Sequence, residues 1–205
     1  MRFNIQSKIF PDFDEFKGVH KSWKSNNETI VFTNGCFDII HQGHIDSILK
    51  SAEMGTKLII GLNSDQSVFQ LKGINRPVFN AKARAVMLAA LEFVDAVIIF
   101  DEDTPANLIA RIIPDVLVKG KDYALHEIVG NKIVLENGGK VETLDLVPDV
   151  STSMVIQRIK LLENEHTNES SAFKSSVNKT LYSGSKESYV FAEIKGMDKV
   201  IKFIN

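Results

Sequence analysis

The sequence has 205 residues, of which 44% are hydrophobic and 24% charged, with 24 Lys and Arg against 26 Asp and Glu. This composition is typical of a globular protein with one main domain, and the net charge of -2 excludes a general electrostatic attraction to nucleic acid or to an anionic membrane. The single cysteine, Cys36, cannot form an internal disulfide. No stretch approaches the roughly 20 apolar residues of a membrane span, and the first residues show no export signal. We therefore expect a cytoplasmic protein.

The first 28 residues carry scattered aromatic side chains among charged ones and predict an N-terminal helical appendage. From residue 29 to residue 162, short apolar runs alternate with segments of helical periodicity. Strands are predicted at 29–33, 58–62, 96–100, 116–118 and 140–144, with helices between them and a last helix starting near Ser151. This alternation predicts an α/β fold, a Rossmann-like open, mostly parallel sheet with helices on both faces. Ligands of such sheets bind beyond the carboxyl ends of the strands.

Residues 163–205 differ in composition from the rest of the chain. A Ser- and Asn-rich stretch up to residue 188 contains few apolar residues and predicts a flexible linker. Two apolar runs, YVFAEI and KVIKFI, follow it and form a candidate terminal hairpin. The predicted organisation is therefore an appendage at 1–28, a main domain at 29–162, and a linker with a terminal hairpin at 163–205.

The densest chemical signal is the segment TNGCFDIIHQGH at 33–44, between the first predicted strand and its helix. Free backbone N–H groups and the helix dipole favour a phosphate at such a helix start, and Gly43 allows the phosphate to come close. His41 and His44 are spaced so that both imidazoles can donate to phosphoryl oxygens. Two alternatives are a pair of capping or buried histidines and a metal site. The remaining histidines lie in unrelated segments, so no protein-bound metal is predicted.

The segment TNGCFDIIHQGH resembles the signature of the cytidylyltransferase-like nucleotidyltransferase superfamily. Further segments resemble, in order, the heptose 1-phosphate adenylyltransferase branch; they are LKG at 71–73, RPV at 76–78, Arg84, LE at 91–92, VD at 94–95, EDTP at 102–105 and PDVLVKGKDY at 114–123. The resemblance covers residues 29–162. Lys121 departs from it, because that branch has a second glycine at this position.

The resemblance implies transfer of AMP from ATP to a sugar 1-phosphate, D-glycero-D-manno-heptose 1-phosphate, which gives ADP-heptose and pyrophosphate. It implies that His41 and His44 stabilise the α-phosphate and the leaving group. Lys72, placed on the loop after the second strand, neutralises charge between the substrates, and Mg²⁺ is carried on the ATP phosphates. The implied nucleotide-binding residues are Cys36, Phe37, Gly43, Lys119, Gly120, Asp122, Tyr123, Ser151, Thr152 and Ser153. The implied sugar-phosphate-binding residues are Asp38, Arg76 and Arg84.

Some of these residues have equally simple structural interpretations. Arg76 and Arg84 are equally well explained as solvated surface charges, and the hydroxyls at 151–153 as helix caps. Asn63-Ser64-Asp65 indicates either turn chemistry or ligand contacts.

Two alternative functions compete with the adenylyltransferase. One is a CTP-dependent cytidylyltransferase acting on a polyol or amino-alcohol phosphate of the glycerol 3-phosphate type. The segment VPDV at 147–150 lacks the arginine-bearing RTxGISTT run of those enzymes, which favours ATP. The other is a non-catalytic nucleotide-sensing module. The expected partners are ATP, the sugar 1-phosphate, a separate sugar kinase and a second copy of the chain in a homodimer, with no nucleic acid or membrane.

Overall fold

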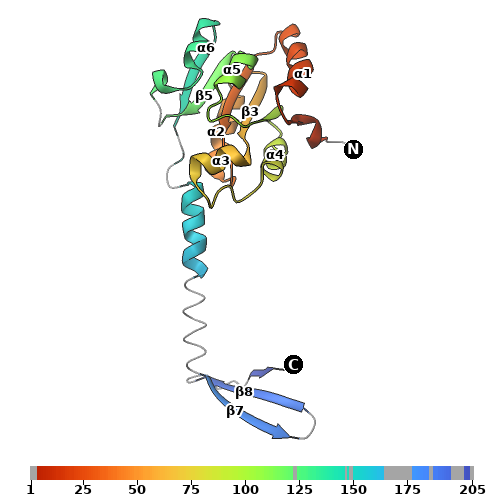
Figure 1. Cartoon of the computed structure of the whole chain (residues 1–205), viewed down its shortest axis with the longest axis vertical. Helices are drawn as coiled ribbons and strands as arrows, with labels where there is room; N and C mark the ends of the chain where they lie inside the picture. Colours follow the sequence, from red (N-terminus) through yellow and green to blue (C-terminus); the bar gives the residue numbers. More distant parts are fainter. Residues whose placement is uncertain are drawn as a thin grey trace. The chain divides into compact units, whose positions relative to one another are not determined.

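The structure is a computed structural model that describes residues 4–121, 124–145, 147 and 150–163, together with the strands between 177 and 203 (Figure 1). It divides into two compact units, Met1–Thr152 and Ser153–Asn205. The elements of the first unit up to β4 are η1 (Ile5–Lys8), β1 (Ile9–Phe10), α1 (Phe13–Ser25), β2 (Ile30–Gly35), α2 (Gln42–Ala52), β3 (Lys57–Asn63), α3 (Asp65–Lys72), α4 (Ala81–Ala89) and β4 (Ala96–Phe100). They are followed by α5 (Ala106–Ile112), β5 (Val116–Gly120), η2 (Leu125–Glu127), α6 (Asn131–Glu136) and β6 (Lys140–Leu144). A helix over 152–163 lies, apart from Thr152, in the second unit.

The described strands of the first unit form one six-stranded sheet with the order β1-β4-β3-β2-β5-β6. All of its pairs are parallel, so the predicted Rossmann-like α/β sheet is confirmed. The strand order reverses between β2 and β5, which lie side by side at the centre. Their pairing ends at Phe32↔Leu117, although both strands continue to Gly35 and Gly120. The loops after β2 and β5 therefore flank the switch point where such sheets bind ligands.

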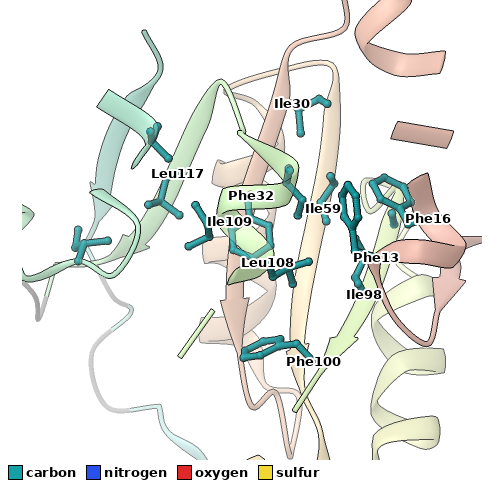
Figure 2. Packing of buried hydrophobic residues seen from close by; sticks show 14 residues of the cluster. Phe13, Phe16, Ile30, Phe32, Ile59, Ile98, Phe100, Leu108, Ile109 and Leu117 are labelled. Atoms are coloured by element: carbon teal, nitrogen blue, oxygen red, sulfur yellow. The ribbon is translucent and has the colours of Figure 1, made fainter. Parts of the chain in front are cut away.

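Alternate strand residues pack into two hydrophobic clusters, one on each face of the sheet. Ile30 and Phe32 of β2 belong to a cluster with side chains of α1, α5 and α6 (Figure 2). Val31, between them, belongs to the cluster on the opposite face, with Ile48 of α2 and Leu88 of α4. This period of two is the geometry of a strand buried on both faces. It confirms that helices cover both sides of the sheet.

The N-terminal segment is built into the sheet and the core instead of lying outside them. The two-residue strand β1 pairs with β4, and Phe16 of α1 is fully buried. Phe16 contacts the rings of Phe10, Phe13 and Trp23 at edge-to-face angles. The predicted helix is therefore present, but residues 1–28 belong to the same compact unit as the rest of the sheet.

Helix α3 is an element that the sequence pattern did not predict. It begins after Ser64, whose hydroxyl accepts a hydrogen bond from the Ser67 amide at 3.2 Å, and it ends at Lys72. Gly73 follows with φ of 91°, a left-handed conformation that glycine adopts without strain. Lys72 therefore lies at the end of a helix and not on a loop, which corrects the expectation.

The second unit contains a three-stranded antiparallel sheet in the order β7-β8-β9, formed by Val177–Gly184, Glu187–Ile194 and Ile201–Phe203. Strands β8 and β9 form where the candidate hairpin was predicted. Strand β7 lies inside the segment predicted to be a linker. Its Val, Thr, Leu and Tyr residues favour a strand despite the polar composition around them.

Candidate phosphate site at the centre of the sheet

The loop after β2 places two imidazoles at the N-terminus of α2. His41 is the N-cap residue of this helix, and His44 lies in its first turn. The ring centroids of the two histidines are 3.8 Å apart and their planes differ by 20°. The Phe37 ring meets the His44 ring edge-on at 5.3 Å. A Cβ on Gly43 would lie 3.2 Å from the His41 ring, a tight contact that would require the ring to shift by a few tenths of an ångström.

Both histidines are held in the neutral form. Burial lowers the pKa of His41 from its usual 6.5. Burial, and then the neighbouring His41, lower the pKa of His44 to about 4. The Nδ1 atom of each ring is buried and has no hydrogen-bond partner among the described residues. Buried polar atoms without a partner are costly and are concentrated at functional sites. A neutral imidazole keeps one N–H donor, as recognition of a phosphoryl oxygen requires.

The N-terminus of α2 is open to an anion. Its first amides have no partner within the helix, and no acidic side chain lies in its first turn. His41 makes no capping hydrogen bond through its side chain within the described part of the chain. The helix dipole adds positive potential at the same place.

Cationic side chains from three further segments surround the loop after β2. Burial raises the pKa of the Cys36 thiol, whereas the positive charges of Lys72, Arg84 and Arg76, in that order, lower it. Lys119, near the end of β5, donates from Nζ to the Asn34 carbonyl at 3.4 Å. The structure therefore brings cations that are up to 47 residues apart in sequence around one short loop, together with Asp38 and Asp65, which pair with Arg76 and Arg84.

Asp38 organises the loop that follows α3. Its side chain is buried and accepts hydrogen bonds from the amides of Val78 at 2.7 Å and Phe79 at 3.0 Å. It also accepts from Nε of Arg76, whose side chain is 14% exposed. This network places Arg76 beside the loop after β2.

Arg84 lies in the interior of the protein. It is fully buried and donates to the carbonyls of Phe79, Cys36 and Asn63 and to the Asp65 carboxylate. The sequence interpretations of a surface charge or an exposed phosphate ligand did not anticipate this environment.

The remaining predicted nucleotide contacts lie at two places. Lys119 and Gly120 end β5 at the switch point, whereas Asp122 and Tyr123 lie outside the described residues. Thr152 donates from Oγ1 to the Ile39 carbonyl at 3.5 Å, next to the histidine loop. Ser151 is half-buried beside it, and Ser153 is the first residue of the second unit.

Sequence analysis missed one residue of this site, Asn34, and left the role of another, Asp65, open. The buried amide oxygen of Asn34, inside the histidine motif, has no partner among the described residues. Asp65 forms the ion pair with Arg84 at 2.7 Å. The segment Asn63-Ser64-Asp65 had been left open, and the structure shows that Ser64 caps α3 while Asp65 pairs with Arg84.

Among the described residues, there is no group of three or more His, Cys, Asp or Glu side chains that could hold a metal ion. Among the same residues, no helix is long and apolar enough to cross a membrane.

The fold and the site define a Rossmann-like α/β protein with a candidate phosphate site at a helix N-terminus. A family model described as cytidylyltransferase-like matches residues 32–158, more than half of the chain. This chain belongs to the cytidylyltransferase-like family, which confirms the resemblance seen in the sequence.

Curated relatives share the same region. The chain is 50% identical over 139 residues to Bifunctional protein HldE of Methylobacillus flagellatus, covering 68% of this chain and 28% of that protein. It is 52% identical over 147 residues to Bifunctional protein HldE of Campylobacter fetus, covering 72% and 30%. The chain thus spans less than a third of the length of these relatives. A solved lipopolysaccharide core biosynthesis protein from Thermoplasma volcanium matches at 23% identity with a TM-score of 0.48, covering 58% of this chain and 97% of that one.

Proposed function

We propose that this chain is an adenylyltransferase that transfers AMP from ATP to D-glycero-D-manno-heptose 1-phosphate and releases pyrophosphate. The observation that carries the proposal is the stacked, neutral pair of His41 and His44 at the open N-terminus of α2, surrounded by cations. Identity of about half to proteins named HldE supports the choice of heptose phosphate.

The chemistry needs charge neutralisation more than it needs a base. An oxygen of the sugar phosphate attacks the α-phosphorus of ATP, a new P–O bond forms, and the bond to the β-phosphate breaks in line with it. Because the attacking phosphate is already ionised, no proton has to be removed. We assign the catalytic roles to His41, His44 and Lys72. The two imidazoles donate N–H groups to the α-phosphate and the leaving group, and Lys72 offsets charge between the two substrates.

The other predicted residues are assigned to the two substrates. We propose that Cys36, Phe37, Gly43, Lys119, Gly120, Asp122, Tyr123 and the hydroxyls of Ser151, Thr152 and Ser153 contact the nucleotide. We propose that the sugar phosphate binds near Arg76. Asp38 contributes by holding the loop of Arg76 through its three hydrogen bonds.

Mg²⁺ fits this site as an ion carried on the ATP phosphates. Asp38 is the single carboxylate between Cys36 and His44, and its oxygens already accept from Arg76, Val78 and Phe79. The loop therefore offers the ion no carboxylate of its own, while Mg²⁺ prefers phosphate oxygens and water. When bound, the ion supplies neutralisation of phosphate charge. The proposal extends to a sugar kinase that supplies the heptose 1-phosphate, to a homodimer and to a cytoplasmic location.

The test is pyrophosphate release in the presence of Mg²⁺, with ATP and CTP each paired with heptose 1-phosphate and glycerol 3-phosphate. Release with ATP and heptose 1-phosphate supports the proposal. Release specific for CTP indicates a cytidylyltransferase instead. Nucleotide binding without release in any pairing indicates a nucleotide-sensing module.

A further inference from the structure

Arg84 uses its guanidinium group to join segments that are distant in sequence. Its Nη1 donates to the Cys36 carbonyl at 2.6 Å and to the Asn63 carbonyl at 2.8 Å. Its Nη2 donates to Asp65 at 2.7 Å, and its Nε donates to the Phe79 carbonyl at 2.9 Å. Four of the five guanidinium N–H donors are therefore engaged by the protein. One donor lies outside this network on a fully buried side chain, so a bidentate bond to a substrate phosphate would have to break the network.

The segments that Arg84 joins carry the proposed catalytic groups. Cys36 begins the loop that leads to His41 and His44, and Asp65 begins the helix that ends at Lys72. The backbone of Phe79 is held at two atoms, because its carbonyl accepts from Arg84 and its amide donates to Asp38. The same Asp38 accepts from Arg76. One buried side chain thus fixes the relative positions of three loops at the site.

We propose that Arg84 is a positioning residue that locks the histidine loop, the start of α3 and the loop before α4 into one arrangement, and that it does not bind the sugar phosphate. The part of this inference that concerns turnover rests on the proposed function. Lysine cannot replace arginine here, because an ammonium group has three donors on a flexible stem and cannot reach four acceptors in a plane. Small displacements of positioned groups lower rates strongly, so loosening of this network lowers kcat.

Cys36 offers a readout that does not depend on activity. It is the one cysteine of the chain, it is half-buried, and its carbonyl is bound by Arg84. Loosening of the loop exposes the thiol to iodoacetamide. The rate of alkylation is measured at a series of alkaline pH values. The limiting rate at high pH is then compared between the proteins, separately from any change in the pKa of the thiol.

The variants are Arg84→Lys and Asp65→Asn, with Val134→Ala as the control. Val134 of α6 is fully buried in the cluster on the other face of the sheet, which contains no residue of the three joined loops, so its truncation destabilises the fold without releasing them. Asp65 is 47% exposed, so Asp65→Asn weakens the ion pair without disturbing the core. All variants are measured at a temperature at which circular dichroism shows them to be folded.

We expect Arg84→Lys to raise the limiting alkylation rate about tenfold or more, the equivalent of one charge-assisted hydrogen bond, and Asp65→Asn to give a smaller increase. Val134→Ala should label at the wild-type rate. In turnover, Arg84→Lys should lower kcat while the KM for heptose 1-phosphate stays within about threefold, the pattern of a group that makes no ground-state contact.

Three results would overturn the inference. They are wild-type alkylation in Arg84→Lys, equal acceleration in Val134→Ala, and a rise in the KM for heptose 1-phosphate with kcat unchanged. If the wild-type chain shows no turnover, the proposed function fails, while alkylation still decides whether Arg84 locks the loops.

Discussion

The imidazole rings of His41 and His44 stack nearly face to face, with centroids 3.8 Å apart. Two imidazolium cations at this distance would repel each other, so the stack is compatible with at most one charge. Burial is the main cause that lowers the pKa values of both rings, which also favours their neutral forms. The pair therefore presents neutral N–H donors at physiological pH.

Removal of one ring should abolish most of the turnover. His44→Ala should lower kcat on the order of 100- to 1,000-fold, the usual cost of losing a donor to transition-state charge. The fold should remain intact, because the sheet core does not depend on this ring. The measurement is steady-state pyrophosphate release together with thermal unfolding. His126→Ala, at an exposed position on η2, is the control. Near-normal turnover in His44→Ala would contradict the assignment.

Lys72 should contribute charge and not packing. It is exposed at the end of α3, so Lys72→Met should leave thermal stability unchanged. Its loss should lower kcat/KM at least about tenfold, because negative charge develops between the substrates. The matched control is Lys82→Met, at an exposed position on α4. Equal activities of the two variants would remove Lys72 from the catalytic group.

Stability should depend on pH through His44. The pKa of this residue is 6.5 in its ordinary state and about 4 in the folded chain. Between these values the unfolded chain binds a proton that the folded chain does not bind, so the free energy of unfolding falls as the pH falls. The loss from pH 6.5 towards pH 4 should be on the order of 1–3 kcal/mol for this side chain. It should be complete once the pH is below the folded pKa.

Urea unfolding at several pH values measures this effect in the wild type and in His44→Gln. The contributions of His20 and His41, whose pKa values are also lowered, are common to both proteins. The variant should lose less stability over the same pH range. Identical pH dependence in the two proteins would show that His44 is not held neutral by the fold.

Residues 163–205 should be dispensable for turnover. A chain of residues 1–162 retains the six-stranded sheet, the histidine loop and most of the helix over 152–163. We expect its kcat to lie within about twofold of the full chain, because no predicted site residue lies beyond Ser153. A folded but inactive truncation would show that the catalytic domain extends further along the chain.

The sequence pattern predicted the central strands well, because these strands are buried on both faces and appear as continuous apolar runs. The segment 96–100 was predicted as a strand and forms β4 with the same limits. Helix α3 escaped prediction because it has no apolar stripe; Val68 is its one fully buried apolar residue, while Phe69 and Leu71 are exposed. Strand β1 has two residues, too few for a periodic signal.

The candidate site was predictable where it follows one motif and not where it depends on long-range contacts. The spacing of His41 and His44 on one helix start is local, and the structure stacks the two rings there. The position of Arg84 depends on carbonyls of Cys36 and Asn63, which are 48 and 21 residues away in sequence. An arginine in the first turns of a helix looks the same in sequence whether it is solvated or buried.

The most direct measurement of the central claim is the fate of labelled phosphate in a reaction with ATP, Mg²⁺ and heptose 1-phosphate. AMP transfer predicts that label in the α-phosphate of ATP appears in the nucleotide sugar and that label in the γ-phosphate appears in pyrophosphate. The account is contradicted if the α-label never joins the sugar, or if the γ-label is transferred to it.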